Sequence, residues 1–288
     1  MTRSMTRRTV GATALALISF ASNSILCRLA LGRHAIDALS FTTLRIVAGA
    51  LALFVLAYLT ARRGGPRPER SGSWTGAVAL FVYAIAFSLA YLRIGAGLGA
   101  LVAFGAVQVT MIGFGIARGE RPGIAEWVGL AIALGGLLGL GLGGRSTVDP
   151  LGAGLMAVAG IAWGVYSLIG RGSRFALFDT AGNFVRATPM ALVVTAFTLA
   201  QAHGSLTGVL LAVISGAITS GVGYSLWYSA LPHLAATRAA LLQLCVPVLA
   251  AIGAVLLLHE TLSPRLVGSG AAILGGVALA VLGKRRAI

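Results

Sequence analysis

The sequence predicts an all-α polytopic membrane protein, in which ten transmembrane helices form two inverted five-helix repeats. Three observations carry this prediction. Of the 288 residues, 58% are hydrophobic and only 10% are charged, whereas about a quarter of the residues in a soluble globular chain are charged. The apolar residues fall into ten long runs, and the second half of the chain repeats features of the first. A soluble all-α protein is excluded because too little polar material is present to cover its surface.

The ten apolar runs set the predicted spans. A helix needs about 20 mostly apolar residues to cross a hydrocarbon core of roughly 30 Å. The first run follows basic residues but stays apolar past Leu31 without a small-residue cleavage site, so we expect a retained helix rather than a signal peptide. The connector 62–72 is markedly polar, and no connector is long enough for a soluble domain. The runs cover 9–31, 39–61, 73–93, 97–117, 125–143, 151–170, 180–201, 207–230, 237–258 and 264–283.

The basic residues predict the orientation of the chain in the membrane. The net charge is +15, but Lys and Arg form short clusters between apolar runs rather than one patch, which is typical of membrane loops and excludes nucleic acid as a partner. With the N-terminus inside, most of these residues lie in cytoplasmic segments, as in the Arg62-Arg63 pair and the Lys284–Arg286 tail. Both termini are therefore predicted to be cytoplasmic.

An internal repeat divides the predicted spans into two groups of five. Residues 97–143 align with residues 237–283 without gaps, and in this alignment Glu120 meets Glu260 while a Gly-Gly pair meets a Gly-Gly pair. The alternative is chance similarity between apolar helices. The repeat is favoured because two apolar segments match by chance at acidic residues and at Gly-Gly pairs far less often than at leucines.

The repeat implies that the two halves have opposite orientations. We assign residues 1–148 to the first five-helix repeat and residues 149–288 to the second, within one transmembrane domain. An odd number of spans reverses the second repeat, so Glu120 is predicted on the cytoplasmic side and Glu260 on the external side. Inverted repeats are common in secondary transporters, where substrate binds near the midplane between the halves.

The chain resembles the EamA-type transporters of the drug/metabolite transporter superfamily. The resemblance rests on an arginine early in the second span of each half, Arg45 and Arg186, and on Pro247 ahead of Glu260 and a Gly-Gly pair. It covers roughly the whole chain, which is similar to bacterial inner-membrane amino-acid exporters, including the aromatic amino-acid exporter. The first half departs from the pattern, because Val107 stands where the second half has proline.

The resemblance carries several implications. It implies ten helices, with a central cavity lined by helices 1–4 and 6–9 and with helices 5 and 10 at the periphery. It also implies alternating access, a location in the bacterial inner membrane and export of amino acids or related metabolites.

Polar side chains inside the spans are the candidate cavity residues, because polar groups in the membrane usually face the bundle interior or a wet cavity. The alternative for each is hydrogen bonding between helices. Trp163 lies too deep in its span for an interfacial belt, so we expect it to pack in the core or to form an apolar wall for substrate. The candidates are Ser22, Asn23, Tyr83, Gln108, Trp163, Tyr166, Ser167, Tyr224 and Gln243.

Five further residues are candidates for gating or structural roles. Arg45 and Arg186 lie one to two turns inside their spans, where they either attract a carboxylate or anchor loop carbonyls; the structural role is favoured. Pro247 is a hinge candidate because it leaves a backbone carbonyl without its usual donor. Glu120 and Glu260 mark equivalent helix ends on opposite sides of the membrane.

Glycine spacing on the fifth span indicates close helix packing. Gly135, Gly139 and Gly143 form successive G-x-x-x-G pairs, and such faces let helices approach closely. They pack either within the bundle or between two copies of the chain, so both a monomer and a homodimer remain open.

The polar residues do not predict an enzyme. The histidines lie at span ends or in loops, no Asp or Glu lies in mid-span, and no His/Cys/carboxylate cluster has metal-ligand spacing. Cys27 and Cys245 lie inside apolar runs. We expect no catalytic residues, no metal, no cofactor and, without a Walker A sequence, no ATP-driven pumping.

The expected partners are membrane lipid and a small-molecule substrate, an amino acid or related metabolite. Because proton-coupled carriers commonly use a buried acid, the sequence favours gradient-driven uniport. Proton antiport of other drugs or metabolites, and a channel or lipid scramblase, are the alternatives.

Overall fold

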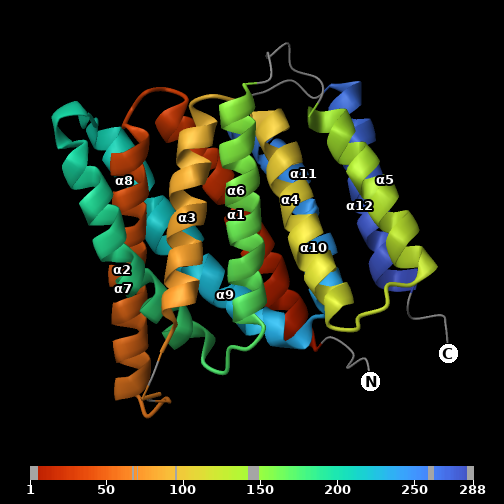
Figure 1. Cartoon of the computed structure of the whole chain (residues 1–288), viewed down its shortest axis with the longest axis horizontal. Helices are drawn as coiled ribbons and strands as arrows, with labels where there is room; N and C mark the ends of the chain where they lie inside the picture. Colours follow the sequence, from red (N-terminus) through yellow and green to blue (C-terminus); the bar gives the residue numbers. More distant parts are fainter. Residues whose placement is uncertain are drawn as a thin grey trace.

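The computed structural model describes residues 6–66, 68–69, 71–94, 96–141, 149–258 and 263–283. These residues form helices without a strand, apart from one isolated bridge between Ile36 and Gly204. Most helices lie side by side in a bundle (Figure 1). The α-helices are α1 (Arg7–Leu31), α2 (Ala38–Arg62), α3 (Trp74–Tyr91), α4 (Ala96–Ala117), α5 (Ile124–Gly141), α6 (Pro150–Gly170), α7 (Ala176–Phe197), α8 (Leu206–Ile214), α9 (Gly223–Ala230), α10 (Ala236–Gln243), α11 (Cys245–Leu258) and α12 (Pro264–Gly283).

Three short segments connect some of these helices. The 3₁₀-helix η1 (Leu199–Gln201) follows α7, and the 3₁₀-helix η3 (Leu231–His233) follows α9. Between α8 and α9 the chain forms the π-helix η2 (Ser215–Val222). The segments α8, η2 and α9 therefore form one continuous span.

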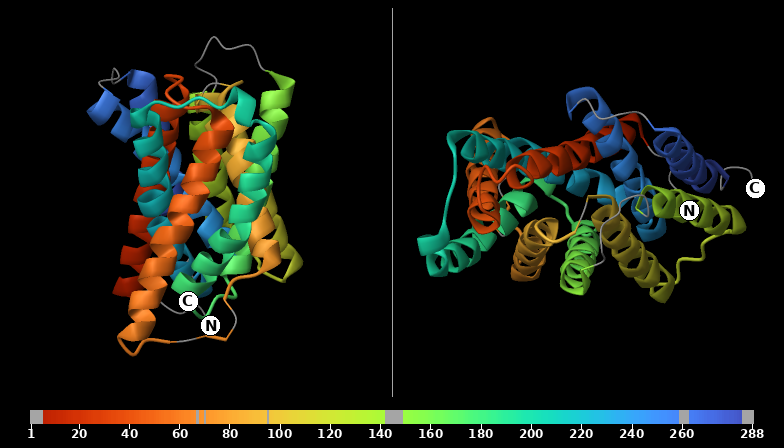
Figure 2. Two further views of the ribbon diagram at one scale, coloured as in Figure 1. Left: turned by 90° about the vertical axis from the view of Figure 1, so that its left-hand side faces the viewer. Right: turned by 90° about the horizontal axis from the view of Figure 1, so that it is seen from above.

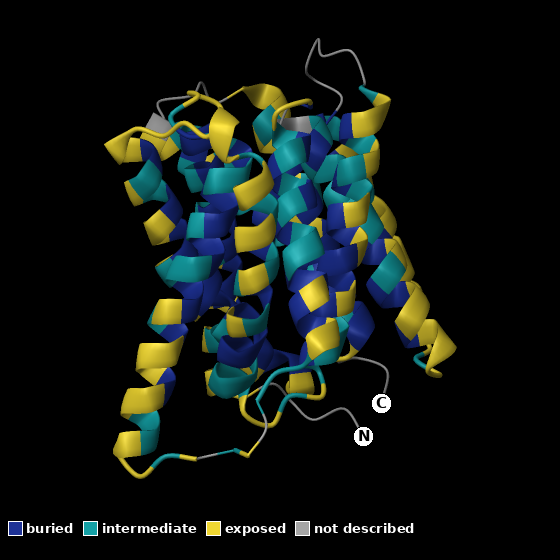
Figure 3. Cartoon of the chain, turned by 60° about the vertical axis from the view of Figure 1, so that its left-hand side comes forward, coloured by how far each residue is buried: buried dark blue, intermediate teal, exposed yellow. Residues whose placement is uncertain are grey.

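The chain is a multi-pass membrane protein. Within the described residues, nine helices are long and apolar enough to cross a bilayer, counting α8–η2–α9–η3 as one and α10–α11 as one. Helix α7 covers the seventh predicted span and is not among the nine, because Asp179, Asn183 and Arg186 lower its hydropathy. Figure 3 shows buried residues along the inner faces of the helices and exposed residues on their outer faces. The exposed faces carry apolar side chains such as Leu51 and Phe54, which suit contact with lipid.

Side-chain caps fix where several helices begin. The carboxylate of Asp37 accepts hydrogen bonds from the backbone N–H groups of Leu39 and Ser40 at the start of α2. Such caps satisfy donors that have no partner within the helix. Equivalent caps begin α1, α3, α6 and α8 at Thr6, Ser73, Asp149 and Ser205, respectively.

Many of the contacts between helices join the first half of the chain to the second. Helix α2 packs against α7, α3 against α6, and α4 against α10. Helix α1 lies against α9 and α11. Helices α5 and α12 form a pair at one side of the bundle, as the view from above in Figure 2 shows.

Glycines allow the close approach of α5 and α12. A Cβ atom added to Gly129 would collide with the carbonyl oxygen of Gly276, and one added to Gly136 would meet backbone of α12 at 2.7 Å. Gly135 has nothing within 4 Å of its Cβ position, and Gly143 lies outside the described residues. A Cβ atom added to Gly139 would collide with the hydroxyl of Ser269 on α12. The predicted close packing is therefore present within the bundle at Gly139, and Gly129 and Gly136 also contribute to it, whereas Gly135 does not.

Two interruptions distinguish the second half of the chain. Helix α10 ends at Gln243 and α11 begins at Cys245, because Pro247 has no N–H to donate to the Gln243 carbonyl. Helix α4, which carries Val107 at the corresponding position, is continuous. The π-helix η2 is the second interruption, and π-turns within α-helices are frequent at functional sites.

The bundle has two ends, which we name from Figure 1. At the lower end α1 begins with Arg7 and α12 ends with Gly283; at the upper end α1 finishes with Leu31. The upper end is tied by Asp37, whose carboxylate accepts a hydrogen bond of 3.1 Å from the backbone N–H of His203. This contact joins the α1–α2 connection to the segment before α8.

Candidate functional site

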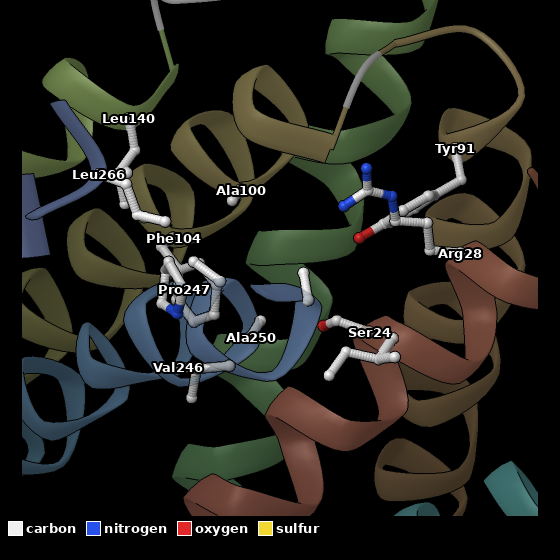
Figure 4. A pocket seen from close by; sticks show the side chains of 13 residues that line it. Ser24, Arg28, Tyr91, Ala100, Phe104, Leu140, Val246, Pro247, Ala250 and Leu266 are labelled. Carbon is white, nitrogen blue, oxygen red and sulfur yellow. The ribbon is translucent and has the colours of Figure 1, made fainter. Parts of the chain in front are cut away.

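Two adjoining cavities lie between the two halves of the chain. The outer cavity, about 260 Å³, is bounded by α1, α4 and α11 and by the upper ends of α3, α5 and α12 (Figure 4). Arg28 and Tyr91 lie at its upper part, and Pro247 forms part of its wall. The inner cavity, about 60 Å³, is deeper in the bundle. The two share Ser24, Phe104 and Val246 as lining residues, so they lie next to each other between the upper end and the centre.

Aromatic rings form most of the wall of the inner cavity. The ring centroid of Trp163 lies 4.7 Å from that of Tyr224, 4.9 Å from that of Tyr83 and 5.1 Å from that of Phe20. These four side chains come from α6, α9, α3 and α1. The cavity therefore offers flat apolar surfaces to a small ligand, with few polar groups to orient it.

Arg45 lies beside this cavity and is almost fully buried, with 1% of its surface exposed. Its Nε donates to the hydroxyl of Ser220 at 2.8 Å. Its Nη2 donates to the hydroxyls of Tyr83, at 3.2 Å, and Tyr224. Its Nη1 is buried and has no hydrogen-bond partner. The guanidinium group thus joins α2 to α3 on one side and to η2 and α9 on the other.

The π-helix contacts a second cavity residue, Asn23. The side-chain oxygen of Asn23 accepts hydrogen bonds from Ser215 at 2.6 Å and Thr219 at 3.2 Å. Ser220, the partner of Arg45, belongs to the same π-helix. The wide π-turn therefore directs its hydroxyls toward polar side chains of both α1 and α2.

A layer of hydrogen bonds joins helices of the two halves below the inner cavity. The indole N–H of Trp163 donates to the side-chain oxygen of Gln243. The Nε2 of Gln243 in turn donates to the sulfur of Met111 at 3.2 Å. The Nε2 of Gln108 donates to the backbone oxygen of Ala240 at 2.8 Å. These bonds connect α6 and α4 to α10.

A second layer lies nearer the lower end. The indole N–H of Trp227 donates to the hydroxyl of Ser167 at 3.0 Å, and the hydroxyl of Tyr228 donates to the backbone oxygen of Tyr166 at 3.0 Å. All four side chains are buried. They join α6 to α9.

The lower end itself is joined by Glu120, which follows α4. Its carboxylate accepts hydrogen bonds from the backbone N–H groups of Ala236 at 2.8 Å and Thr237 at 3.1 Å, and from the Thr237 hydroxyl at 2.9 Å. Arg171 donates to it at 3.1 Å. Glu120 therefore caps the start of α10, a helix whose own N-cap residue makes no side-chain bond. We call this set of contacts the lower latch.

The lower latch changes the acidity of Glu120. Partial burial alone would raise its pKa, but the hydrogen bonds from Ala236 and Thr237 and the charge of Arg171 hold the pKa below the ordinary 4.5. The carboxylate is therefore ionised at neutral pH.

A further set of lower-end bonds joins the α2–α3 connection to α7. Nη1 of Arg186 donates to the backbone oxygen of Ser71 at 2.7 Å, and the Asp179 carboxylate accepts from the N–H of Gly72 at 2.9 Å. The side-chain oxygen of Asn183 accepts from the N–H of the next residue, Ser73, at 2.8 Å. Arg186 thus contacts a loop carbonyl, whereas Arg45 contacts hydroxyls beside the cavity.

Glu260, which the sequence alignment pairs with Glu120, lies outside the described residues.

The cavity-lining residues overlap partly with the candidates chosen from sequence. Of the nine candidates, Asn23, Tyr83, Trp163 and Tyr224 line the inner cavity. The others, Ser22, Gln108, Tyr166, Ser167 and Gln243, line neither cavity.

Other residues of the site carried no sequence signal. Phe20, Phe87 and Phe104 are lining residues that look like ordinary core side chains, and Ser215 and Ser220 look like small residues of an apolar helix. The sequence signal for the π-helix would have been a shift in the helical spacing of the polar residues within the eighth predicted span.

The arrangement of helices and cavities agrees with comparisons with known proteins. Residues 150–282 match the EamA-like transporter family. This part of the chain is similar to an EamA-like transporter domain. The match supports membership of the drug/metabolite transporter superfamily, whose members are membrane transporters.

Two whole-chain comparisons extend this result. The uncharacterized protein PA1977 of Pseudomonas aeruginosa is 52% identical over 277 residues, which cover 95% of this chain and 94% of that protein. The chain therefore belongs to one family with PA1977. A solved crystal structure superposes with a TM-score of 0.74 at 23% identity, covering 93% of this chain and 98% of the other. That likeness shows that the fold of this chain occurs in a solved protein.

Proposed function

We propose that the chain is a secondary transporter that exports amino acids or related small metabolites from the cytoplasm by alternating access. The observation that carries the proposal is the pair of adjoining cavities, which lies between the upper end and the centre and ends above two hydrogen-bonded layers. A separate cavity of about 430 Å³ lies at the lower end, beside Thr9 and Tyr228. A transporter needs a central site that opens to one side at a time. The EamA-like domain supports transport rather than catalysis as the function.

The proposal includes ten membrane spans, with α7 as the seventh, and two inverted repeats, residues 1–148 and 149–288. The contacts between α2 and α7, between α3 and α6 and between α5 and α12 support it, because each pair joins helices from the two halves. The basic residues of the lower-end connectors support cytoplasmic termini, and in the proposal the spans lie in the inner membrane of a bacterium. The cavities then open to the outside.

Gradient-driven uniport is the proposed mode of energy coupling. Among the described residues, no Asp or Glu lines either cavity, so the path contains no acid of the kind that proton-coupled carriers use. Proton antiport of other drugs or metabolites is the second candidate, and a channel or lipid scramblase is the third.

Counterflow in proteoliposomes tests the proposal. Purified protein is reconstituted with a high internal concentration of unlabelled amino acids at the same pH on both sides, and uptake of labelled amino acid is followed. We expect uptake without a pH gradient. Uptake that requires a pH gradient and disappears with an uncoupler would refute uniport, and ion conductance without substrate would indicate a channel.

Two tryptophan variants connect the transport to the cavity. Trp163→Ala removes a wall of the inner cavity, so we expect uptake to fall at least tenfold while the protein still reaches the membrane. Trp74→Ala is the matched control, because Trp74 is 62% exposed at the start of α3, away from both cavities. Equal uptake by the two variants would remove Trp163 from the substrate path.

A further inference from the structure

Arg45 carries a buried positive charge. An arginine stays protonated, and Arg45 is buried inside the bundle without an ion pair to any carboxylate within 4.0 Å among the described residues. The nearest acid on its own helix is Asp37, eight residues away, which corresponds to about 12 Å of helix rise. Asp37 itself caps α2 and contacts His203. Burial of an unpaired charge is costly, so the site favours a ligand that brings a negative charge.

The hydrogen bonds around Arg45 present a donor to the inner cavity. The hydroxyl of Tyr83 accepts from Nη2 of Arg45 and from the hydroxyl of Tyr224, both at 3.2 Å. A hydroxyl has two acceptor positions and one donor, so the proton of Tyr83 is left for a ligand. Tyr83 and Tyr224 both line the inner cavity, whereas Arg45 lies behind them. The positive charge polarises the two phenols, which strengthens Tyr83 as a donor to an anion.

The same wall is unsuited to a cationic ligand. Aromatic rings can hold an ammonium group through cation–π contacts, and the inner cavity is rich in such rings. However, the guanidinium carbon of Arg45 lies 5.4 Å from the ring centroid of Tyr83, so that ring already faces a positive charge. The side-chain oxygen of Asn23 is also engaged by Ser215 and Thr219. Among the described residues no carboxylate lines the cavities to receive an ammonium group.

We propose that the substrate of this site is an organic carboxylate with an apolar, ring-sized body, and that it needs no ammonium group. This inference rests on the proposed function. The carboxylate accepts the proton of Tyr83 and lies near the charge of Arg45, and the body lies against Phe20 and Trp163. The path is therefore expected to select 2-oxo acids and similar monoanions at least as well as amino acids, and to exclude amines.

Three probes with the same phenyl ring separate the possibilities. Phenylpyruvate carries only the carboxylate, phenethylamine only the ammonium, and phenylalanine both. Binding to the purified full chain is measured by isothermal titration in detergent. We expect phenylpyruvate to bind at least as tightly as phenylalanine, and phenethylamine to bind at least tenfold more weakly than either. Absence of phenylpyruvate binding, or tighter binding of phenethylamine, would overturn the proposal.

Variants test the assigned atoms. Tyr83→Phe removes the donor and keeps the ring, so we expect phenylpyruvate to bind about tenfold more weakly, as for the loss of a hydrogen bond to a charged group. Tyr58→Phe is the matched control, since Tyr58 is exposed on α2 away from both cavities. Arg45→Lys should retain more phenylpyruvate binding than Arg45→Gln. Unchanged binding in Tyr83→Phe would contradict the assignment even if both Arg45 variants fail to fold.

Transport distinguishes this proposal from the proposed function. Counterflow of phenethylamine without counterflow of phenylpyruvate would preserve the transporter and refute the anionic substrate. Conversely, a chain that binds phenylpyruvate in detergent but exchanges none of the three probes would preserve the anion site and refute transport.

Discussion

Removal of the Glu120 carboxylate should open the lower end of the bundle. Glu120 connects the first half of the chain to the second through two backbone N–H groups at the start of α10, the hydroxyl of Thr237 and the guanidinium of Arg171. Glu120→Ala removes all of these contacts. Glu120→Gln keeps the shape and one acceptor oxygen but removes the charge, so we expect about half the effect.

The magnitude follows from the kind of bond and its exposure. A hydrogen bond to a charged group contributes about 1.5–3 kcal/mol, and loss of a helix cap costs about 1 kcal/mol. Because the Glu120 side chain is 21% exposed and its pair with Arg171 is partly solvated, the low end applies and the ion pair adds little. We expect Glu120→Ala to weaken closure by about 2–3 kcal/mol, which raises the open fraction on the order of 100-fold.

Cysteine labelling measures this opening. Met111 is fully buried above the lower latch and contacts Gln243, so Met111→Cys reports on separation of α4 from α10. The background variant replaces the two native cysteines, Cys27 and Cys245, with alanine. Maleimide applied from the lower side should label the Met111→Cys variant about 100-fold faster when Glu120→Ala is added.

The control for this measurement is a carboxylate at the other end. Asp149→Asn removes an exposed carboxylate that pairs with Arg93 at the upper end, and it should leave the labelling rate unchanged. If neither Glu120→Ala nor Glu120→Gln accelerates labelling in correctly folded protein, the lower latch does not hold the bundle closed.

Three further predictions follow from the packing and the charges. Because the pKa of Glu120 is held below 4.5, its contribution to closure is complete above that pH and is lost only as the pH falls through the lowered pKa. The labelling rate of Met111→Cys, divided at each pH by the rate for the same variant after denaturation to remove the titration of the thiol itself, should therefore be constant between about pH 6 and pH 8, and a step in this ratio would assign closure to another group. Gly136→Leu should lower the melting temperature by several degrees because its side chain collides with α12, whereas Gly135→Leu, with open space around it, should not; equal melting curves would contradict the tight α5–α12 contact. Pro247→Ala should restore the backbone bond to Gln243, straighten the break between α10 and α11, and slow counterflow with little change in binding, and an unchanged rate would remove Pro247 from the moving parts.

Local chemistry explains which features of the fold follow from sequence. The apolar runs predict the helices to within a few residues, because span length is set by the bilayer. Pro247 predicts the break near Gln243, since a missing N–H acts on its own helix. Asn23, Tyr83, Trp163 and Tyr224, which line the inner cavity, were candidates because polar or amphipathic side chains stand out in apolar spans.

The remaining features depend on contacts between distant segments. Nothing near Arg45 in the sequence indicates Ser220 or Tyr224, which follow it by more than 170 residues. The role of Glu120 as a cap for α10 is similarly hidden, because the acid and the helix lie in different halves. Gln108 and Gln243 contact neighbouring helices and do not line either cavity. Which way they point depends on how each helix is rotated about its axis. The sequence does not fix this rotation, because a membrane helix is apolar on all sides.

The partners of Arg45 also have a consequence for the synthesis of the chain. Helix α2 emerges from the ribosome long before the segment that contains Ser220 and Tyr224, so a nascent first half holds a buried guanidinium with only Tyr83 of its three hydroxyl partners. A product terminated after α5 would therefore be unstable in the membrane and would be degraded rapidly by proteases. For the start of α10 the order is reversed. The carboxylate of Glu120, which caps this helix, is synthesised before the helix itself.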